Sequence, residues 1–165
     1  MIILGIDPGI ATLGYGVLLA EGGRFSAVDY GVVTTPKGTP LPERLEKLEE
    51  GVAALFDRFT PDEVAVEELF FTKNITNGIM VAEARGVVLL TARRRVGDNI
   101  FEYTPNQIKM ALTGYGGAQK KQMQMMVQAL LKLKSLPRPD DAADALAVAL
   151  CHGHASRLRT QFRIK

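Results

Sequence analysis

Residues 2–9 read IILGIDPG, an apolar run that meets an aspartate and then a Pro-Gly break. An uninterrupted apolar run is typical of a strand that is buried on both faces. Asp7 therefore stands at the end of a buried strand, where a carboxylate loses solvation unless it is paired or binds a metal. The alternative is an aspartate that caps the turn through its own backbone. Asp7 alone does not decide between the two roles.

Two further strands are predicted directly after this one. Residues 13–20 and 24–35 are β-like segments on either side of Gly22-Gly23, which is a hairpin signal. Together with residues 2–6 they predict a three-stranded antiparallel meander. Two short strands are predicted later in the chain, over residues 64–67 and 100–103.

Helical periodicity starts after Pro42 and ends at Pro61-Asp62. A long helix over residues 74–95 is apolar on nearly all sides, so it suits contact with a partner as well as with the core. Thr104 and Gln107 form a capping-box pattern that starts another helix. Two more helices are predicted, over residues 119–133 and from about Asp140 to beyond Cys151. This order of elements predicts an α/β fold in which a mixed sheet carries helices on its faces.

The chain has 165 residues and a mass of 18.0 kDa, which fits one compact domain. Its 47% hydrophobic and 23% charged residues exclude a disordered protein. Cys151 is the single cysteine, so an internal disulfide and a cysteine zinc site are excluded, as suits a reducing cytoplasm. The first residues do not resemble a signal peptide, and no apolar stretch reaches the roughly 18 residues of a membrane span. We therefore predict a cytoplasmic protein without a membrane segment.

The formal net charge is only +2, but its distribution is uneven. Residues 104–139 contain lysines and an arginine but no acid, and residues 145–165 contain no acid either. The basic side chains of the first of these segments are Lys109, Lys120, Lys121, Lys132, Lys134 and Arg138. A nearly neutral chain with one basic half can present a surface that binds a polyanion.

Three further acids repeat the situation of Asp7. Glu67 ends the predicted strand over residues 64–67, and strand alternation places it and Glu68 on opposite faces. Asp141 and Asp144 share one face of the last helix, although acids in a first helical turn also complement the helix dipole. We expect Asp140 to be the N-cap, which leaves the other two aspartates available for a divalent cation such as Mg²⁺.

Two late histidines, His152 and His154, are interpreted as structural or surface residues rather than metal ligands. A zinc site requires a closer cluster of histidine and cysteine.

At this point the sequence resembles the RuvC family, the bacterial Holliday junction resolvases of the RNase H-like superfamily. The matching segments run in family order over essentially the whole chain. They are residues 3–9 (ILGIDPG), 14–16 (GYG), 66–70 (VEELF) with Lys73-Asn74, 84–87 (ARGV), 107–109 (QIK), 120–126 (KKQMQMM) and 141–147 (DAADALA).

The resemblance implies an RNase H-like fold, with a mixed five-stranded sheet and helices on both faces. It implies that Asp7, Glu67, Asp141 and Asp144 are the catalytic, metal-binding acids. They would hold two Mg²⁺ ions per active site, with Mn²⁺ as a substitute. The implied activity is paired symmetric nicking of four-way DNA junctions by a homodimer, leaving 5′-phosphate and 3′-hydroxyl ends. The implied setting is homologous recombination and DNA repair, with the RuvA–RuvB branch-migration complex as a partner.

The resemblance also implies residues that bind DNA. Phe70 matches an aromatic residue that stacks on a base, and the adjacent Phe71 could take that place instead. Lys109 and Lys120 match lysines near the cleaved strand, where they would contact phosphates. Lys121 is a further candidate. Glu67-Glu68 and Asp140-Asp141 are doubled acids, so a shift of one residue in the comparison would move a ligand.

These expectations divide the chain into an RNase H-like resolvase domain at residues 1–156 and a basic C-terminal tail at residues 157–165. Two other functions are considered. An actin-like ATPase also begins with a strand and an aspartate, but it needs two such folds, and no G-x-x-x-x-G-K-[ST] loop is present. A non-catalytic junction-binding module is disfavoured, because four acids near DNA would be repulsive without a metal.

Overall fold

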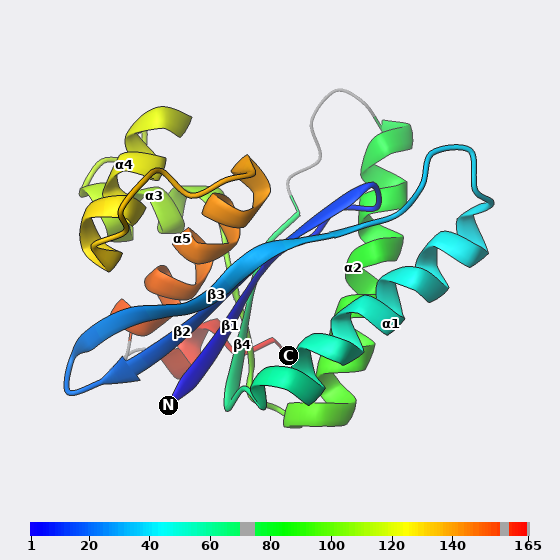
Figure 1. Cartoon of the computed structure of the whole chain (residues 1–165), viewed down its shortest axis with the longest axis horizontal. Helices are drawn as coiled ribbons and strands as arrows, with labels where there is room; N and C mark the ends of the chain where they lie inside the picture. Colours follow the sequence, from blue (N-terminus) through cyan, green and yellow to red (C-terminus); the bar gives the residue numbers. More distant parts are fainter. Residues whose placement is uncertain (70–74, 156–158, 165) are drawn as a thin grey trace.

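The computed structural model of the chain describes residues 1–69, 75–155 and 159–164 (Figure 1). Within them, five strands form one mixed sheet in the order β3-β2-β1-β4-β5. Strand β1 pairs antiparallel with β2 and parallel with β4, while β3 extends the antiparallel side and β5 the parallel side. The predicted meander and mixed sheet are confirmed. The strands are β1 Ile2–Asp7, β2 Thr12–Glu21, β3 Arg24–Thr34, β4 Glu63–Glu67 and β5 Ile100–Tyr103.

Helices cover both faces of the sheet, as Figure 1 shows: α1 and α2 lie on one face, and α3, α4 and α5 on the other. Their ends differ from the predicted ones by a few residues, because local patterns define helix ends loosely. The helices are α1 Leu41–Phe59, α2 Ile75–Val96, α3 Pro105–Thr113, α4 Lys120–Leu131, α5 Asp140–His154 and the short 3₁₀ helix η1 Arg159–Phe162.

Local signals explain most of the boundaries. Gly22 and Gly23 both have positive φ, +57° and +77°, as a two-residue hairpin turn between β2 and β3 requires. Thr104 caps α3 through the predicted capping box with Gln107. The predicted N-cap of the last helix was wrong. The cap position is Pro139, and Asp140 is the first residue of α5, with its side chain turned to other partners.

Side-chain alternation along β1 divides the core into two layers. Leu4 and Ile6 pack with the helices α1 and α2, whereas Ile3 packs in the layer formed with α3, α4 and α5. Gly5 faces α5, and Asp7 continues the same alternation at the end of the strand. The acid therefore emerges on the α5 side of the sheet, at the carboxyl edge of its central strand.

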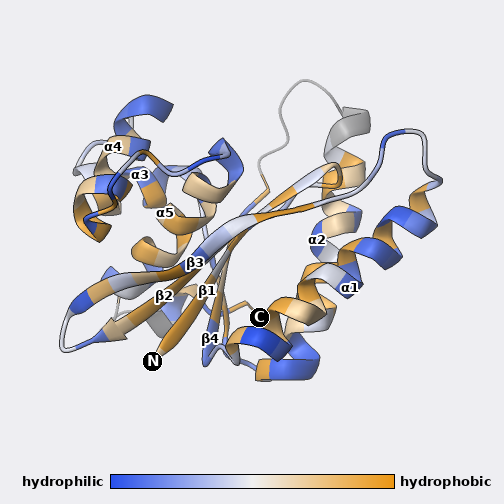
Figure 2. Cartoon of the chain, viewed as in Figure 1, coloured by the Kyte–Doolittle hydropathy of each residue, from blue (hydrophilic) through white to orange (hydrophobic). Residues whose placement is uncertain are grey.

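Helix α5 approaches the sheet closely because glycines lie beneath it. A Cβ atom on Gly16 would lie 2.8 Å from the backbone nitrogen of Leu146. A Cβ atom on Gly5 or Gly14 would collide with the carbonyl oxygen of Ala145 or Asp141. Figure 2 shows that α5 is apolar along most of its length. The three glycines therefore let a buried helix lie directly on β1 and β2, and they fix the height of its first turn.

The described end of the chain returns to the sheet. Arg163 bridges to Phe101 on β5 with its guanidinium 5.6 Å from the ring centre, and the Ile164 N–H donates to the Ile100 carbonyl. In the part of the chain that the structure describes, no helix has the length and apolar character needed to cross a membrane.

Candidate active site

The four predicted acids come from three elements that meet at one edge of the sheet. Asp7 ends β1 and Glu67 ends β4, and the two strands are parallel neighbours with Ile6 opposite Val66. Asp141 and Asp144 belong to the first turns of α5. The Asp141 backbone lies directly over Gly14, which is the residue paired with Asp7. The fold thus brings together side chains that are far apart in the sequence.

The pKa values show how strongly these carboxyls interact. The pKa of Asp7 is raised to about 8, first by burial and then by the charges of Glu67, Asp144 and Asp141. The pKa of Glu67 is raised to about 7 by burial and by Asp144, against a hydrogen bond with Asp7 and the charge of Lys109. Burial also raises the pKa of Asp144. The acids therefore carry their full charge at neutral pH only if a cation joins them.

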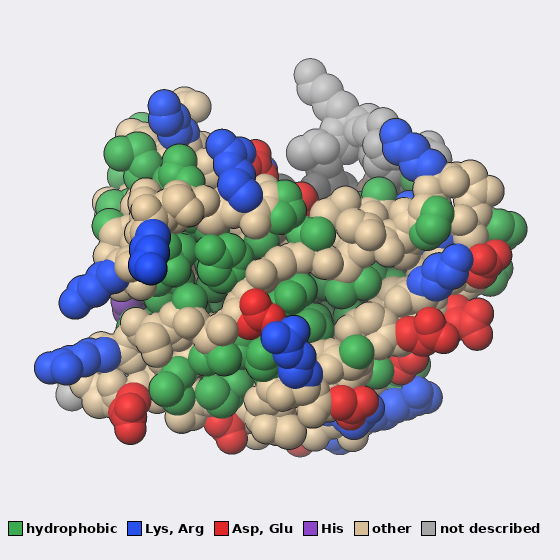
Figure 3. Space-filling model, in the orientation of Figure 1, with side chains coloured by type: hydrophobic (Ala, Val, Ile, Leu, Met, Phe, Trp, Pro, Cys, Tyr) green, Lys and Arg blue, Asp and Glu red, His purple; other side chains and the backbone are tan. Residues whose placement is uncertain are grey.

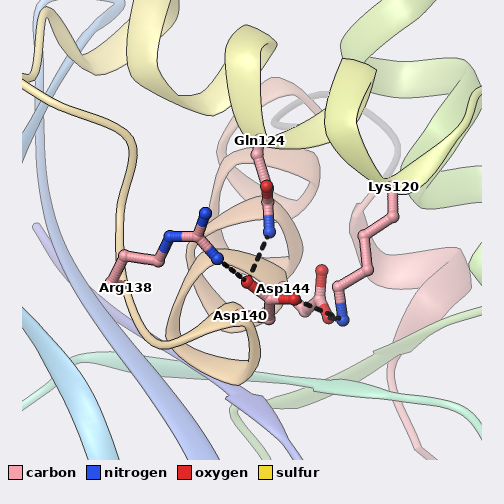
Figure 4. A network of polar contacts seen from close by, with 5 residues as sticks. All are labelled: Lys120, Gln124, Arg138, Asp140 and Asp144. Carbon is pink, nitrogen blue, oxygen red and sulfur yellow. Dashed lines mark hydrogen bonds and ion pairs between the residues drawn. The ribbon is translucent and has the colours of Figure 1, made fainter.

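Lys120 supplies part of that positive charge (Figure 4). Its Nζ atom lies 3.0 Å from Asp144 Oδ2 and 3.7 Å from Asp140 Oδ2. Burial lowers the pKa of Lys120, but the hydrogen bond to Asp144 and the nearby aspartates outweigh it and raise the pKa overall. Lys120, the first residue of α4, is therefore charged, and its side chain points toward the acids of α5.

Two adjoining pockets open over the acids. One, of about 280 Å³, is lined by Glu67, Lys109, Lys120 and Asp144 among others. The other, of about 230 Å³, is lined by Asp7, Glu67 and Glu68. Glu67 borders both pockets, while Glu68 borders only the second. Both glutamates are half-buried.

The donor set suits a hard divalent cation, because every candidate ligand is a carboxylate oxygen. Among the described residues, however, no three Asp, Glu, His or Cys side chains are already arranged to hold a metal ion. The mutual pKa effects still place the four acids within electrostatic reach of one another. Lys120 occupies the position of a counter-charge here, and the acid side chains can reorient when a cation binds.

The predicted DNA-binding residues fall into three groups. Lys109 and Lys120 border the larger pocket, beside the acids. Lys121 follows on α4 and is exposed, but it lines neither pocket. Phe70 and Phe71 lie outside the described residues. Figure 3 shows Lys and Arg side chains over both halves of the visible face; those over α1 are mixed with acidic side chains, whereas those over α3 and α4 have few acidic side chains near them.

Comparison with known proteins identifies the family. The family model of crossover junction endodeoxyribonuclease RuvC matches residues 3–152. The chain belongs to the RuvC family. The RuvC of Rubrobacter xylanophilus is 55% identical over 95% of this chain and 87% of its own length. The RuvC of Alkaliphilus oremlandii is 50% identical over 100% of both chains.

Solved structures agree with this family assignment. Thermus thermophilus RuvC in complex with a Holliday junction substrate superposes with a TM-score of 0.89 at 36% identity, covering 99% of this chain and 100% of the other. The yeast mitochondrial Holliday junction resolvase shares only the fold, with a TM-score of 0.68 at 14% identity over 98% of this chain and 81% of its own. The predicted RNase H-like fold is therefore confirmed.

Two polar networks were not predicted, one beside the acid cluster and one at the other end of α5. Gln124 and Asp140 form a hydrogen bond between α4 and α5, which pairs a buried amide with an acid expected only to cap a helix. His152 is buried, with Nδ1 2.7 Å from the Tyr103 hydroxyl and Nε2 2.8 Å from Glu63 Oε2. No local pattern signals such contacts, because the partners lie on different elements. His152 thus takes part in a structural network across β4, β5 and α5.

Proposed function

We propose that this chain is a Mg²⁺-dependent Holliday junction resolvase that nicks two opposed strands of a four-way junction symmetrically. The observation that carries the proposal is the cluster of Asp7, Glu67, Asp141 and Asp144 at one sheet edge, beside two lysines, in a chain that belongs to the RuvC family. The structure of the Thermus thermophilus relative with its junction substrate supports the same substrate class here.

The four acids would hold two Mg²⁺ ions, or Mn²⁺ in their place. When bound, the ions would supply activation of a water and neutralisation of the leaving oxygen of a phosphodiester, and cleavage would leave a 5′-phosphate and a 3′-hydroxyl. Lys109 and Lys120, at the border of the larger pocket, would contact phosphates of the cleaved strand. Phe70 or Phe71 would stack on a base, and Lys121 would add a looser phosphate contact.

Cutting two strands at once requires two copies of the chain, and α2 is the element we propose for their contact. Ile79, Glu83, Gly86 and Leu90 are all exposed and recur at the spacing of one helix face. Ile79 and Leu90 are 53% and 54% exposed. A second chain that covers this face would bury both.

The proposed setting is the cytoplasm, in homologous recombination and DNA repair, with RuvA–RuvB as the branch-migration partner. In this setting residues 1–156 form the resolvase domain, and residues 157–165 add positive charge next to it.

The decisive test incubates the purified protein with a synthetic mobile four-way junction and with a linear duplex of the same sequence. Paired nicks are expected on the junction only, with Mg²⁺ present. Asp7→Asn should bind the junction and leave it uncut, because phosphate contacts supply most of the affinity. Absence of paired nicks with the wild-type chain, or unchanged nicking by Asp7→Asn, contradicts the proposed function.

A further inference from the structure

One carboxylate that is not among the four proposed metal ligands lies at the centre of the polar network beside them (Figure 4). Asp140 Oδ1 accepts hydrogen bonds from Arg138 Nη1 at 2.7 Å and from Gln124 Nε2 at 2.9 Å. Its other oxygen, Oδ2, lies 3.7 Å from Lys120 Nζ. Asp140 thus joins the first turn of α5 to α4 through two residues of α4 at once.

Gln124 makes this connection rigid. Its side chain is only 6% exposed, and its amide nitrogen donates to Asp140. A buried amide that loses its partner loses a hydrogen bond without regaining water, so Gln124 holds the Asp140 carboxylate in one orientation. Lys120 is different, since its side chain is 54% exposed and has a long flexible stem. The Gln124 amide is therefore fixed, whereas the Lys120 ammonium depends on its ion pairs to stay in one place.

Lys120 is shared between two carboxylates with different expected roles. Asp144, at 3.0 Å, is a proposed metal ligand, so its negative charge would be balanced by the metal ion. Asp140, at 3.7 Å, is not a proposed metal ligand, and its carboxylate is held by Gln124 and Arg138. We propose that Asp140 is a positioning residue, which holds the Lys120 ammonium at the border of the acid cluster so that it meets the phosphate to be cleaved. This inference rests on the proposed function.

Asp140 could also act only as an acid in the first turn of α5, where it complements the helix dipole. In that role Asp140 would affect cleavage only by stabilising α5 in its place, and Lys120 would not be involved. A double-mutant cycle separates the two roles, because it isolates the coupling between a chosen pair. The cycle uses Asp140→Ala, Lys120→Ala and the double variant, with single-turnover junction cleavage and junction binding measured on the full chain in Mg²⁺.

Asp140→Ala is expected to slow cleavage by about 3- to 10-fold, because the cleavage rate falls steeply when the Lys120 ammonium is displaced from the phosphate. Its junction affinity should stay equal or rise, since one negative charge near a polyanion is removed. In the Lys120→Ala background the same change should alter the rate by less than about twofold. Asp140→Asn keeps the size and the contact with Gln124 but lacks the charge, so its rate should fall between those of Asp140→Ala and wild type. Asp140→Glu keeps the negative charge, so it should cleave at close to the wild-type rate and faster than Asp140→Ala.

The matched control is Glu43→Ala, which removes an exposed carboxylate and its 2.9 Å ion pair with Lys47 on α1, on the opposite face of the sheet. It should cleave at the wild-type rate. Equal rates for wild type and Asp140→Ala, or an undiminished Asp140→Ala effect without Lys120, overturn the positioning role and leave the proposed function intact. Failure of the wild-type chain to cut junctions overturns both.

Discussion

The surroundings of Asp7 disfavour the charged form of its carboxyl group. It stands on the central strand, close to three other acids, and its pKa is raised from 3.8 to about 8 by burial and by those charges. Its position at a strand end could be predicted from the residues 2–9 alone. The size of its electrostatic penalty could not, because it depends on Glu67 and Asp144, which only the fold brings near.

This penalty predicts how stability changes with pH. Between pH 4 and 8 the folded chain keeps a proton on Asp7 that the unfolded chain releases, so the free energy of unfolding without metal should fall as the pH rises through that range. Thermal unfolding in a chelator at several pH values from 5.5 to 8.5 measures this. Asp7→Asn carries no such proton and should flatten the dependence. An equally steep dependence in Asp7→Asn would refute the assignment of the effect to this residue.

The same groups predict how Mg²⁺ binding changes with pH. Carboxylates bind metal when they are deprotonated, so binding must displace the protons of Asp7 and Glu67, whose pKa values are about 8 and 7. The Mg²⁺ concentration that half-stabilises the protein against heat should fall as the pH rises from 6 to 8.5. The change should reach up to about tenfold per pH unit for each proton released. A Mg²⁺ midpoint that stays constant over this range would contradict the involvement of both acids.

At the scale of elements, α5 carries two acids and owes its place to glycines beneath it. Gly14→Ala would drive a Cβ atom into the Asp141 carbonyl oxygen, so the first turn of α5 must rise from β2. We expect a loss of about 1–3 kcal/mol in the free energy of unfolding. We also expect cleavage to slow by more than about tenfold, because Asp141 and Asp144 move away from Asp7. Denaturant unfolding and single-turnover cleavage measure the two effects.

Gly86→Ala is the control for this substitution, read by denaturant unfolding at a protein concentration low enough to keep the chain monomeric, because Gly86 lies on the proposed dimer face. It lies in α2 with no atom within 4 Å of the added Cβ, so its free energy of unfolding should stay the same or rise by up to about 1 kcal/mol. If Gly14→Ala unfolds and cuts like wild type, then the close approach of α5 does not set the geometry of the site.

Some predictions about helices and strands were confirmed by the structure, and others were wrong or could not be made. The strands of the meander, the Gly22-Gly23 turn and the Thr104 cap follow from neighbouring residues, and all were predicted correctly. Asp140 was misassigned as a cap because its partners, Gln124 and Lys120, belong to another helix. The glycines under α5 carried no signal either, since a close approach between elements is visible only after both are placed.

At the scale of the whole molecule, the exposed face of α2 predicts a dimer. Leu90→Glu would place a charge in the proposed contact, where burial of an unpaired carboxylate is costly. It should shift the protein from dimer to monomer in sedimentation equilibrium. On a junction it should replace paired nicks by single ones.

Val28→Glu is the matched control for Leu90→Glu. Val28 is 50% exposed, a similar value, but it lies on β3 rather than α2. This variant should sediment as the wild type does. A dimeric Leu90→Glu protein would place the contact between copies elsewhere on the surface.

The order of the elements, with α5 long after β1 and β4, has a consequence for protein synthesis. The ribosome releases β1 and β4, with Asp7 and Glu67, long before it releases Asp141 and Asp144. Until then the sheet face that holds Ile3 and Ala65 lacks its cover, and a nascent chain with bare apolar surface is prone to aggregation. A growing polypeptide therefore lacks two of the four proposed metal ligands until α5 has left the exit tunnel. The emergence of α5 both covers this face of the sheet and completes the proposed acid cluster.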